Sequence, residues 1–261
     1  SLETNKQWKS PFFFIQAADT QLGLIERYLE NKPDPKWDKE VLLTRKAIEI
    51  ANQMNPKPKF FVVCGDLVDA MPGQINREAQ VKDLKNCFKD LTNEIPLVCV
   101  CGNHDVGDNP TPDSVDDYKS KFGDDYYTFD CGGVLFIVLN SQYYKERTLV
   151  QDLASAQDEW LEKVIQNAKN YKHVVVLQHI PWFLLNPDED DDIYFNIEKS
   201  LRMKMLDQLY NAGVRYIFCG HWHRNAGGKY KDLELVVTSA IGAQLGNDKS
   251  GFRIVKVFED S

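Results

Sequence analysis

The chain has no excess of positive charge, few cysteines and no long uncharged hydrophobic run. Its formal net charge of −8 argues against general binding to nucleic acids or anionic membranes, because both require a large basic surface. Small phosphate-containing substrates are not excluded by this charge. Six cysteines are too sparse for a disulfide scaffold, and most fall in apolar segments, which indicates a reduced, cytoplasmic setting. No signal peptide or membrane-spanning run is visible.

The sequence also lacks a Gly, Ser or Pro-rich linker that would divide it. Apolar residues make up 43% of the 261 positions, which is enough to bury a sizeable core. We therefore expect a single domain over residues 1–261, with its core at about 11–258.

Hydrophobic periodicity predicts strands that alternate with helices in the first half and a strand-rich second half. Gly132-Gly133 separates two strand-like runs and predicts a tight hairpin turn. We expect a four-layer αββα sandwich of two mixed β-sheets flanked by helices. The expected strands are 11–18, 60–64, 96–101, 126–131, 134–140, 173–178, 215–219, 235–239 and 252–258, and the expected helices are 40–54, 76–91, 113–122, 154–170 and 197–211.

Short polar clusters directly follow several of these expected strands. They are Gly65-Asp66-Leu67-Val68-Asp69, Gly102-Asn103-His104-Asp105 and Gly220-His221-Trp222-His223. Asp19 and His179 stand at the ends of two further strands. Each cluster alone could be an ordinary turn, but ligands bind beyond the carboxyl ends of strands in open α/β sheets. Their shared position therefore predicts one converging site.

The residue types in these clusters suit a pair of divalent metal ions that activate water for phosphoryl transfer. Asp66 is the best candidate for a bridging carboxylate, and Asp19 would complete one ion. Asn103 offers a neutral oxygen, whereas the adjacent His104 is the expected proton donor to a leaving alkoxide. Asp69 could accept a hydrogen bond from His104. His179, His221 and His223 are the remaining expected ligands.

These motifs resemble those of the calcineurin-like metallophosphoesterases, from Asp19 to His223. The resemblance implies a dinuclear site, attack on phosphorus by a metal-bound hydroxide, and His104 as the general acid supported by Asp69. It assigns one ion to Asp19, Asp66 and His223, and the other to Asp66, Asn103, His179 and His221.

The chain departs from the family pattern where Gln21 stands in place of the usual His. An amide oxygen hardens the ligand set, so we expect Mn²⁺ or Mg²⁺ there before Fe or Zn²⁺. The phosphate-clamping arginines of classical Ser/Thr phosphatases are also missing, since Ala70 and Cys101 occupy those places. Substrate phosphate is then expected to be held by the metals, Asn103, His104 or Arg224.

Three stretches are similar to a cytosolic branch of the family. They are 55–61, 178–181 and 223–228. This likeness implies a monomeric Ser/Thr protein phosphatase that acts on phosphoproteins, with the Akt kinase as a substrate. One alternative is a nucleotide diphosphate or cyclic nucleotide hydrolase, and Gln21 is the sequence feature that favours it. The other is a catalytically weak protein-binding scaffold. Retention of His104 argues against the scaffold.

Two features near His179 leave alternatives open. The acidic run 188–192 is either a solvated loop or a rim that repels polyanions and accepts protein substrates. The aromatic residues around it either form an apolar wall of the site or belong to the core. They are Trp182, Phe183, Tyr194 and Phe195.

Overall fold

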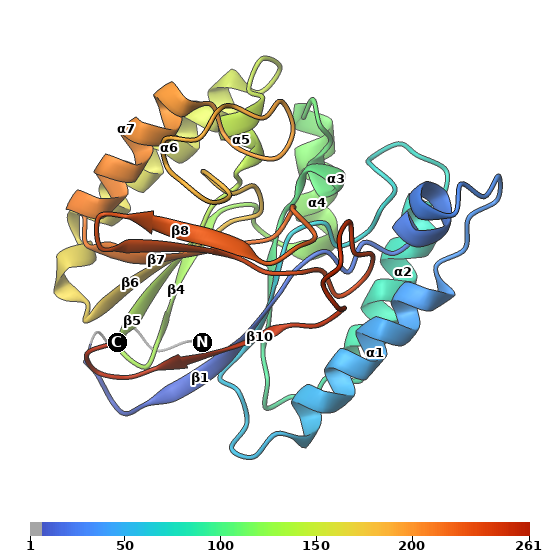
Figure 1. Cartoon of the computed structure of the whole chain (residues 1–261), viewed down its shortest axis with the longest axis horizontal. Helices are drawn as coiled ribbons and strands as arrows, with labels where there is room; N and C mark the ends of the chain where they lie inside the picture. The colour runs from blue at the N-terminus through green and yellow to red at the C-terminus, as the bar shows by residue number, and fades with distance from the viewer. Residues whose placement is uncertain (1–6) are drawn as a thin grey trace.

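Two β-sheets lie face to face in the computed structural model, which describes residues 7–261 (Figure 1). The first has the order β10-β1-β2-β3, with β1, β2 and β3 parallel and β10 antiparallel at the edge. The second has the order β4-β5-β6-β7-β9-β8, with parallel strands in the middle and an antiparallel strand at each edge. The strands are β1 (Phe12–Ala17), β2 (Phe61–Cys64), β3 (Leu97–Val100), β4 (Tyr127–Cys131), β5 (Val134–Val138), β6 (His173–Leu177), β7 (Val214–Cys219), β8 (Ala226–Tyr230), β9 (Leu233–Val237) and β10 (Arg253–Val257).

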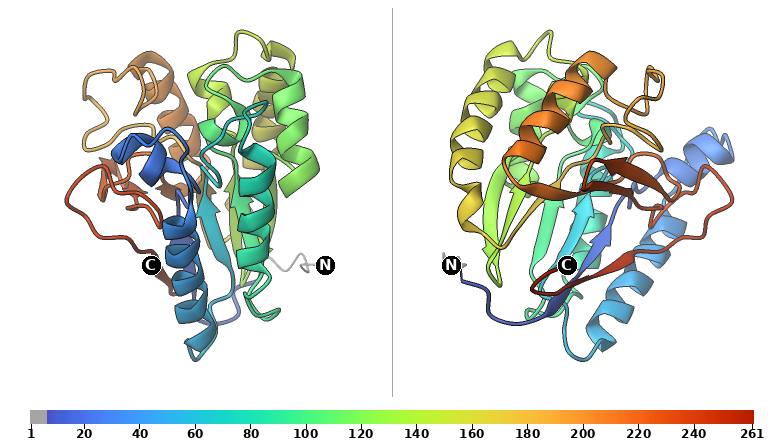
Figure 2. Two further views of the ribbon diagram at one scale, coloured as in Figure 1. Left: turned by 90° about the vertical axis from the view of Figure 1, so that its right-hand side faces the viewer. Right: turned by 60° about the vertical axis from the view of Figure 1, so that its left-hand side comes forward.

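Helices cover the outer face of each sheet. Figure 2 shows α1 and α2 against the first sheet, and α6 and α7 against the second. The helices are α1 (Asp38–Gln53), α2 (Arg77–Phe88), α3 (Asn103–Val106), α4 (Pro112–Phe122), α5 (Gln142–Lys145), α6 (Gln151–Gln166) and α7 (Lys199–Asn211), with a π-helical turn at Ile25–Leu29 and a 3-10 turn at Ala168–Asn170. None of the helices in the described part of the chain is long and apolar enough to cross a membrane.

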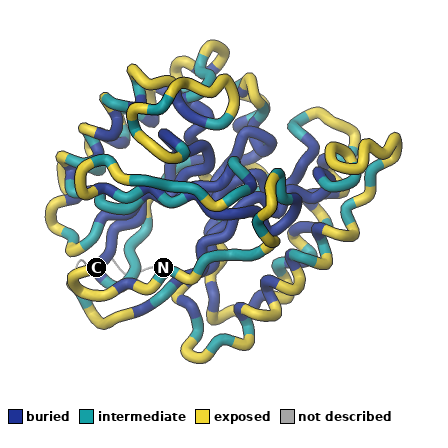
Figure 3. Tube along the Cα trace, viewed as in Figure 1, coloured by how far each residue is buried: buried dark blue, intermediate teal, exposed yellow. Residues whose placement is uncertain are grey.

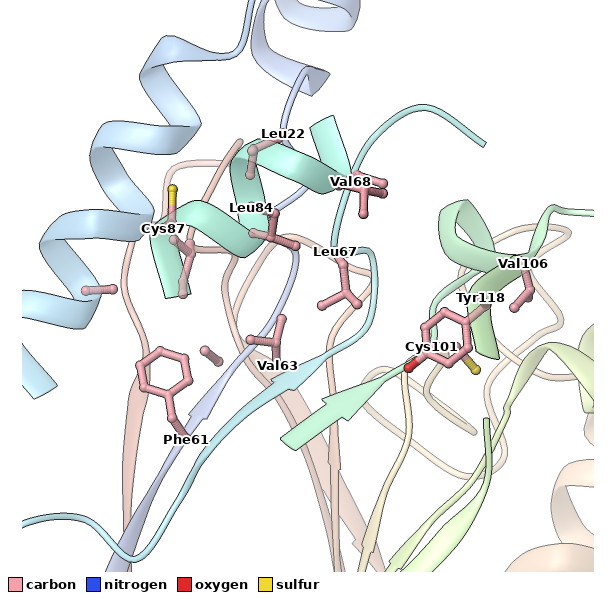
Figure 4. Packing of buried hydrophobic residues seen from close by; sticks show 14 of the residues in the cluster. Leu22, Phe61, Val63, Leu67, Val68, Leu84, Cys87, Cys101, Val106 and Tyr118 are labelled. Carbon is pink, nitrogen blue, oxygen red and sulfur yellow. The ribbon is translucent and has the colours of Figure 1, made fainter. Parts of the chain in front are cut away.

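The core has three apolar layers because side chains alternate along each strand. On β2, Phe61 and Val63 face α1 and α2, whereas Val62 and Cys64 face the other sheet. Figure 4 shows Phe61 and Val63 in the same cluster as Leu84 of α2. The second sheet packs on α7 in the same way, and the strands form the buried centre of the molecule (Figure 3). The predicted four-layer sandwich is thereby confirmed.

The differences from the predicted elements are local. The expected helix 154–170 is divided into α6 and the 3-10 turn Ala168–Asn170. Strand β8 was not predicted because glycines are rare in strands, yet here Gly227 lies so close to β9 that a Cβ atom would be 2.3 Å from the Leu235 carbonyl oxygen. Helices α3 and α5 have four residues each, too few to show a periodic pattern.

Candidate metal centre

The predicted ligands meet at one edge of the two sheets. Asp19, Asp66 and Asn103 follow β1, β2 and β3, while the histidines follow β6 and β7. The seven predicted ligands are at most 3% exposed. The charged and polar groups among them are therefore removed from water and need compensation. The seven are Asp19, Gln21, Asp66, Asn103, His179, His221 and His223.

The backbone takes an unusual conformation at five of these residues. Their φ angles are positive, which costs a non-glycine residue about 1 kcal/mol or more and is often found at functional sites. Hydrogen bonds from Asp19 N to Gly65 O (3.0 Å) and from Gln21 N to Asp66 O (2.9 Å) hold two of the turns together. The angles are 52° at Asp19, 34° at Gln21, 52° at Asp66, 70° at His221 and 51° at His223.

The carboxylates and imidazoles form two groups that share Asp66. One group is Asp66, His179 and His221, and the other is Asp19, Asp66 and His223; in each, the potential ligand atoms lie within 4.8 Å of one another. His179 Nε2 is 3.3 Å from Asp66 Oδ2, and His223 Nε2 is 3.3 Å from Asp19 Oδ1. A shared carboxylate is the arrangement that a pair of closely spaced metal ions requires.

Two amide oxygens add to these groups. Asn103 Oδ1 lies 3.1 Å from His179 Nε2 and therefore belongs to the Asp66, His179 and His221 group. Gln21 donates its amide N–H to Asp69 Oδ1 at 3.4 Å, while its Oε1 atom is buried without a hydrogen-bond partner. A buried oxygen without a donor fits a nearby cation, which would satisfy it.

Backbone carbonyls fix the orientation of the three imidazoles. His179 Nδ1 is 2.8 Å from Cys64 O, His221 Nε2 is 2.9 Å from Tyr194 O, and His223 Nδ1 is 2.6 Å from Ala243 O. A carbonyl oxygen only accepts hydrogen bonds, so each of these nitrogens carries a proton. The other nitrogen of each ring then has a lone pair that can bind a metal ion. His179 Nε2 and His221 Nδ1 then face each other at 3.0 Å, a distance that two lone pairs tolerate only with a cation or proton between them.

The electrostatic effects among these side chains agree with this arrangement. Burial would lower the pKa of His179, but the Asp66 carboxylate outweighs it and raises the pKa to about 9. Burial and the neighbouring His179 hold the pKa of His221 well below its usual value. Burial would raise the pKa of Asp66, yet the nearby His179 and His104 lower it below its usual range. The Asp66, His179 and His221 group thus stabilises one positive charge. A metal ion would take the place of that proton.

His104 lies beside the ligands and is held differently from them. Its backbone N–H donates to Asp66 Oδ1 at 2.9 Å, and its Nδ1 is 2.5 Å from the Asp69 backbone carbonyl oxygen. The Asp69 carboxylate was expected to accept this bond, but its Oδ1 is 3.6 Å away. Both Asp69 oxygens accept hydrogen bonds from Arg27 instead. His104 therefore keeps Nε2 as the ring nitrogen that is available to the cavity.

Asp105 and Arg77 support the site from behind and were not predicted. The Asp105 carboxylate accepts from Gly102 N at 2.8 Å and Leu67 N at 3.0 Å, which ties together the turns after β2 and β3. Burial, with a smaller effect of Asp66, raises its pKa to about 6. The buried Arg77 donates to the backbone oxygens of Ala70, His104 and Asp105 at 2.8–3.1 Å. Asp105 belongs to the recognised motif, whereas nothing in the sequence marks Arg77.

A cavity of about 440 Å³ opens onto these residues. Asp66, His104 and His223 line it, and Arg27 is the one Lys or Arg among its described lining residues. Arg224, expected to bind phosphate, does not line this cavity. Its guanidinium lies 4.2 Å from the centre of the Trp222 ring and donates to the Leu245 carbonyl.

The aromatic residues after His179 divide between the core and the site. Trp182 and Phe183 are fully buried in the cluster between the second sheet and its helices. Tyr194 and Phe195 line the cavity. The structure thus supports both alternatives, each for one pair of residues.

The chain is similar to known proteins in sequence and in fold. The family model described as calcineurin-like phosphoesterase matches residues 15–225. The chain is 48% identical over 260 residues to Serine/threonine-protein phosphatase CPPED1 of Homo sapiens, covering 98% of this chain and 83% of the relative. The Danio rerio protein of that name is 47% identical over 264 residues, covering 99% and 85%.

Two solved structures share the fold. A dimetal phosphatase from Danio rerio has a TM-score of 0.61 at 17% identity, covering 89% of this chain and 88% of that chain. A purple acid phosphatase from Lupinus luteus seeds has a TM-score of 0.67 at 13% identity, covering 100% of this chain and 51% of the other.

Proposed function

Because the chain belongs to the calcineurin-like phosphoesterase family, we propose that it is a phosphomonoesterase that uses two divalent metal ions. The observation that carries this proposal is the position of Asp66, which is common to both groups of ligand atoms. One ion would be held by Asp19, Gln21, Asp66 and His223, and the other by Asp66, Asn103, His179 and His221. When bound, such ions act as Lewis acids on phosphoryl oxygens and lower the pKa of water.

His104 is the proton donor of the proposed reaction. As a water oxygen bonds to phosphorus and the bond to the leaving oxygen breaks, the leaving oxygen would take the proton from His104 Nε2. The Asp69 carbonyl holds the ring through Nδ1. Replacing His104 with Ala should lower kcat by about 10²–10⁴-fold, the usual contribution of a general acid, without loss of metal binding. Metal titration beside steady-state kinetics checks this, and an unchanged kcat would refute the role.

Arg27 is the proposed phosphate-binding cation in place of the expected Arg224. Its side chain is 46% exposed and lines the same cavity as His104. Asp69 accepts from Nε and Nη2, so the guanidinium is held in place with further N–H groups left for an anion. The turn that carries it is fixed by Glu40, whose buried carboxylate accepts from Ile25 N at 2.8 Å and Gly23 N at 3.2 Å.

The proposed substrate is phosphoserine or phosphothreonine in a protein, with the Akt kinase as a candidate. The name of the relatives that are 47–48% identical supports this substrate class. We further propose a monomeric, single-domain enzyme of the cytoplasm that prefers Mn²⁺ or Mg²⁺, because Gln21 contributes an amide oxygen where an imidazole would favour softer metals.

The alternative substrates are nucleotide diphosphates and cyclic nucleotides, which Gln21 favours. Turnover of a phosphothreonine peptide, ADP-ribose and cyclic AMP should be compared at the same Mn²⁺ concentration. We expect the highest kcat/KM for the peptide. A higher kcat/KM for either nucleotide would overturn the proposed substrate, and no turnover of any of the three would favour the scaffold.

A further inference from the structure

The segment between β6 and α7 turns back over the candidate metal centre. In Figure 1 it is the yellow to orange stretch that leads from β6 into α7. It contains the acidic run 188–192 and, shortly before α7, Tyr194 and Phe195, both of which line the cavity. Tyr194 is the point at which this segment meets the ligands.

Tyr194 contacts two of the ligands through two different groups. Its hydroxyl oxygen accepts a hydrogen bond from Asn103 Nδ2 at 2.8 Å, and its backbone carbonyl lies 2.9 Å from His221 Nε2. Its ring also lies against the His221 ring, with 4.8 Å between the centroids. We propose that Tyr194 is a positioning residue that orients Asn103 and His221 and thereby sets the affinity of the ion they share. This inference rests on the proposed two-ion site.

The hydroxyl of Tyr194 holds the side-chain amide of Asn103 in one orientation. Its Nδ2 donates to the Tyr194 hydroxyl and to Asp108 Oδ1, each at 2.8 Å. With both amide hydrogens occupied, Oδ1 is directed toward His179 Nε2, 3.1 Å away. Loss of one of these bonds frees the amide to rotate away from the ion.

The position of Tyr194 is fixed by its own segment. Asp192 Oδ1 accepts from the backbone N–H groups of Tyr194 and Phe195 at 2.7 and 2.8 Å. Glu189 accepts from three backbone N–H groups between residues 184 and 186, and Asp191 from the buried Arg202 at 2.9 Å. Three members of the acidic run therefore fold the segment, although most of the run is exposed to solvent.

The proposal predicts an asymmetric effect on the two ions. Tyr194 contacts ligands of the Asp66, Asn103, His179 and His221 site, whereas His223 is held by the Ala243 carbonyl and Gln21 by Asp69. Residues that orient metal ligands typically contribute 10–100-fold in metal affinity. Only one of the two binding constants should therefore respond to a change at residue 194.

The test is a Mn²⁺ titration of the metal-stripped full chain by calorimetry, with equilibrium dialysis for the stoichiometry. For Tyr194→Phe we expect one binding constant to weaken about tenfold or more and the other to stay within twofold. Tyr28→Phe is the matched control, because Tyr28 lines the same cavity and is 61% exposed. It should leave both constants unchanged.

A second variant reaches the same site without removing the hydroxyl. Asp192→Ala releases the backbone of Tyr194 and should weaken the same constant. Unchanged constants in both variants, or equal weakening at both sites, would overturn the proposal, as would a raised KM for a phosphopeptide with unaltered metal binding. Binding of fewer than two ions by the unaltered chain would instead refute the proposed dinuclear centre.

Discussion

At the scale of single residues, the site separates the side chains proposed for metal binding and for proton donation, although they are neighbours in sequence. Asn103 and His104 both belong to the first turn of α3, yet Asn103 Oδ1 faces His179 while the His104 ring packs against Asp69. Consecutive helical residues point about 100° apart, which sends adjacent side chains to different groups. One short helix thus positions the side chains that are proposed for both functions.

Arg27 lines the cavity and Arg224 does not, so substitutions at these two residues test which one binds phosphate. Arg27→Met should weaken binding of inorganic phosphate and raise KM for a phosphopeptide by roughly 10–100-fold. This is the effect expected when one or two charged hydrogen bonds are lost. Calorimetry with phosphate and steady-state kinetics measure both. Arg224→Met is the matched control and should change neither value by more than about twofold. The opposite pattern would return the role to Arg224.

The protonation of His179 predicts how metal binding depends on pH. Its pKa of about 9 in the metal-free site means that the ring is protonated at pH 7, whereas a metal ligand must be neutral. Binding should therefore release a proton, and the apparent affinity should rise with pH by roughly tenfold per unit up to about pH 9. Titrations in two buffers with different ionisation enthalpies detect this release. Binding heats that are equal in both buffers would contradict it.

At the scale of elements, connections between strands and helices are held in place by buried side chains. Arg202 on α7 is an example, because its guanidinium donates to the carbonyls of Ile197, Pro187 and Glu189 at 2.9–3.0 Å. Residues 187, 189 and 197 lie outside the helices and strands, so their carbonyls rely on a side chain as donor. The segment that carries Tyr194 therefore depends on a residue of the following helix.

Arg202→Met should destabilise the fold by about 3 kcal/mol, because it leaves several carbonyls unpaired in a buried place. The free energy of unfolding in urea measures this loss. Arg147→Met is a suitable comparison, since Arg147 pairs with Asp158 where both side chains are 38–40% exposed. A pair of that kind contributes less than about 1 kcal/mol. Equal losses in the two variants would contradict the anchoring role of Arg202.

At the scale of the whole molecule, the candidate centre joins the two sheets. Asp19 and Asp66 come from the first sheet and the three histidines from the second, so bound ions would link the two halves of the sandwich. Chelation should accordingly lower the stability of the entire fold.

Removal of metal with EDTA should lower Tm by roughly 10–20 °C. Two sites filled at 100 times their Kd stabilise the folded state by about 5 kcal/mol together, and each kcal/mol shifts Tm by about 2–4 °C in a chain of this size. Scanning calorimetry before and after chelation, with Mn²⁺ added back, measures the shift. Asp66→Asn should respond much less, because it lacks the shared carboxylate. The same Tm in all states would rule out the expected linkage.

Local features of the sequence were sufficient to predict the sandwich and a converging polar site. Strand patterns and the polar clusters that follow them are local features, and parallel strands place such clusters at one edge whatever the details of packing. The convergence of Asp66, Asn103 and His221 at one edge could be predicted for that reason.

The residues that hold these groups in place are far from them in the sequence and could not be predicted. Arg27 pairs with Asp69, 42 positions away, and Tyr194 meets Asn103 across 91 positions. No periodicity links such distant residues, because their contact depends on how loops cross the edge of the two sheets. The same packing placed Arg224 against Trp222 instead of in the cavity, although it directly follows a predicted ligand.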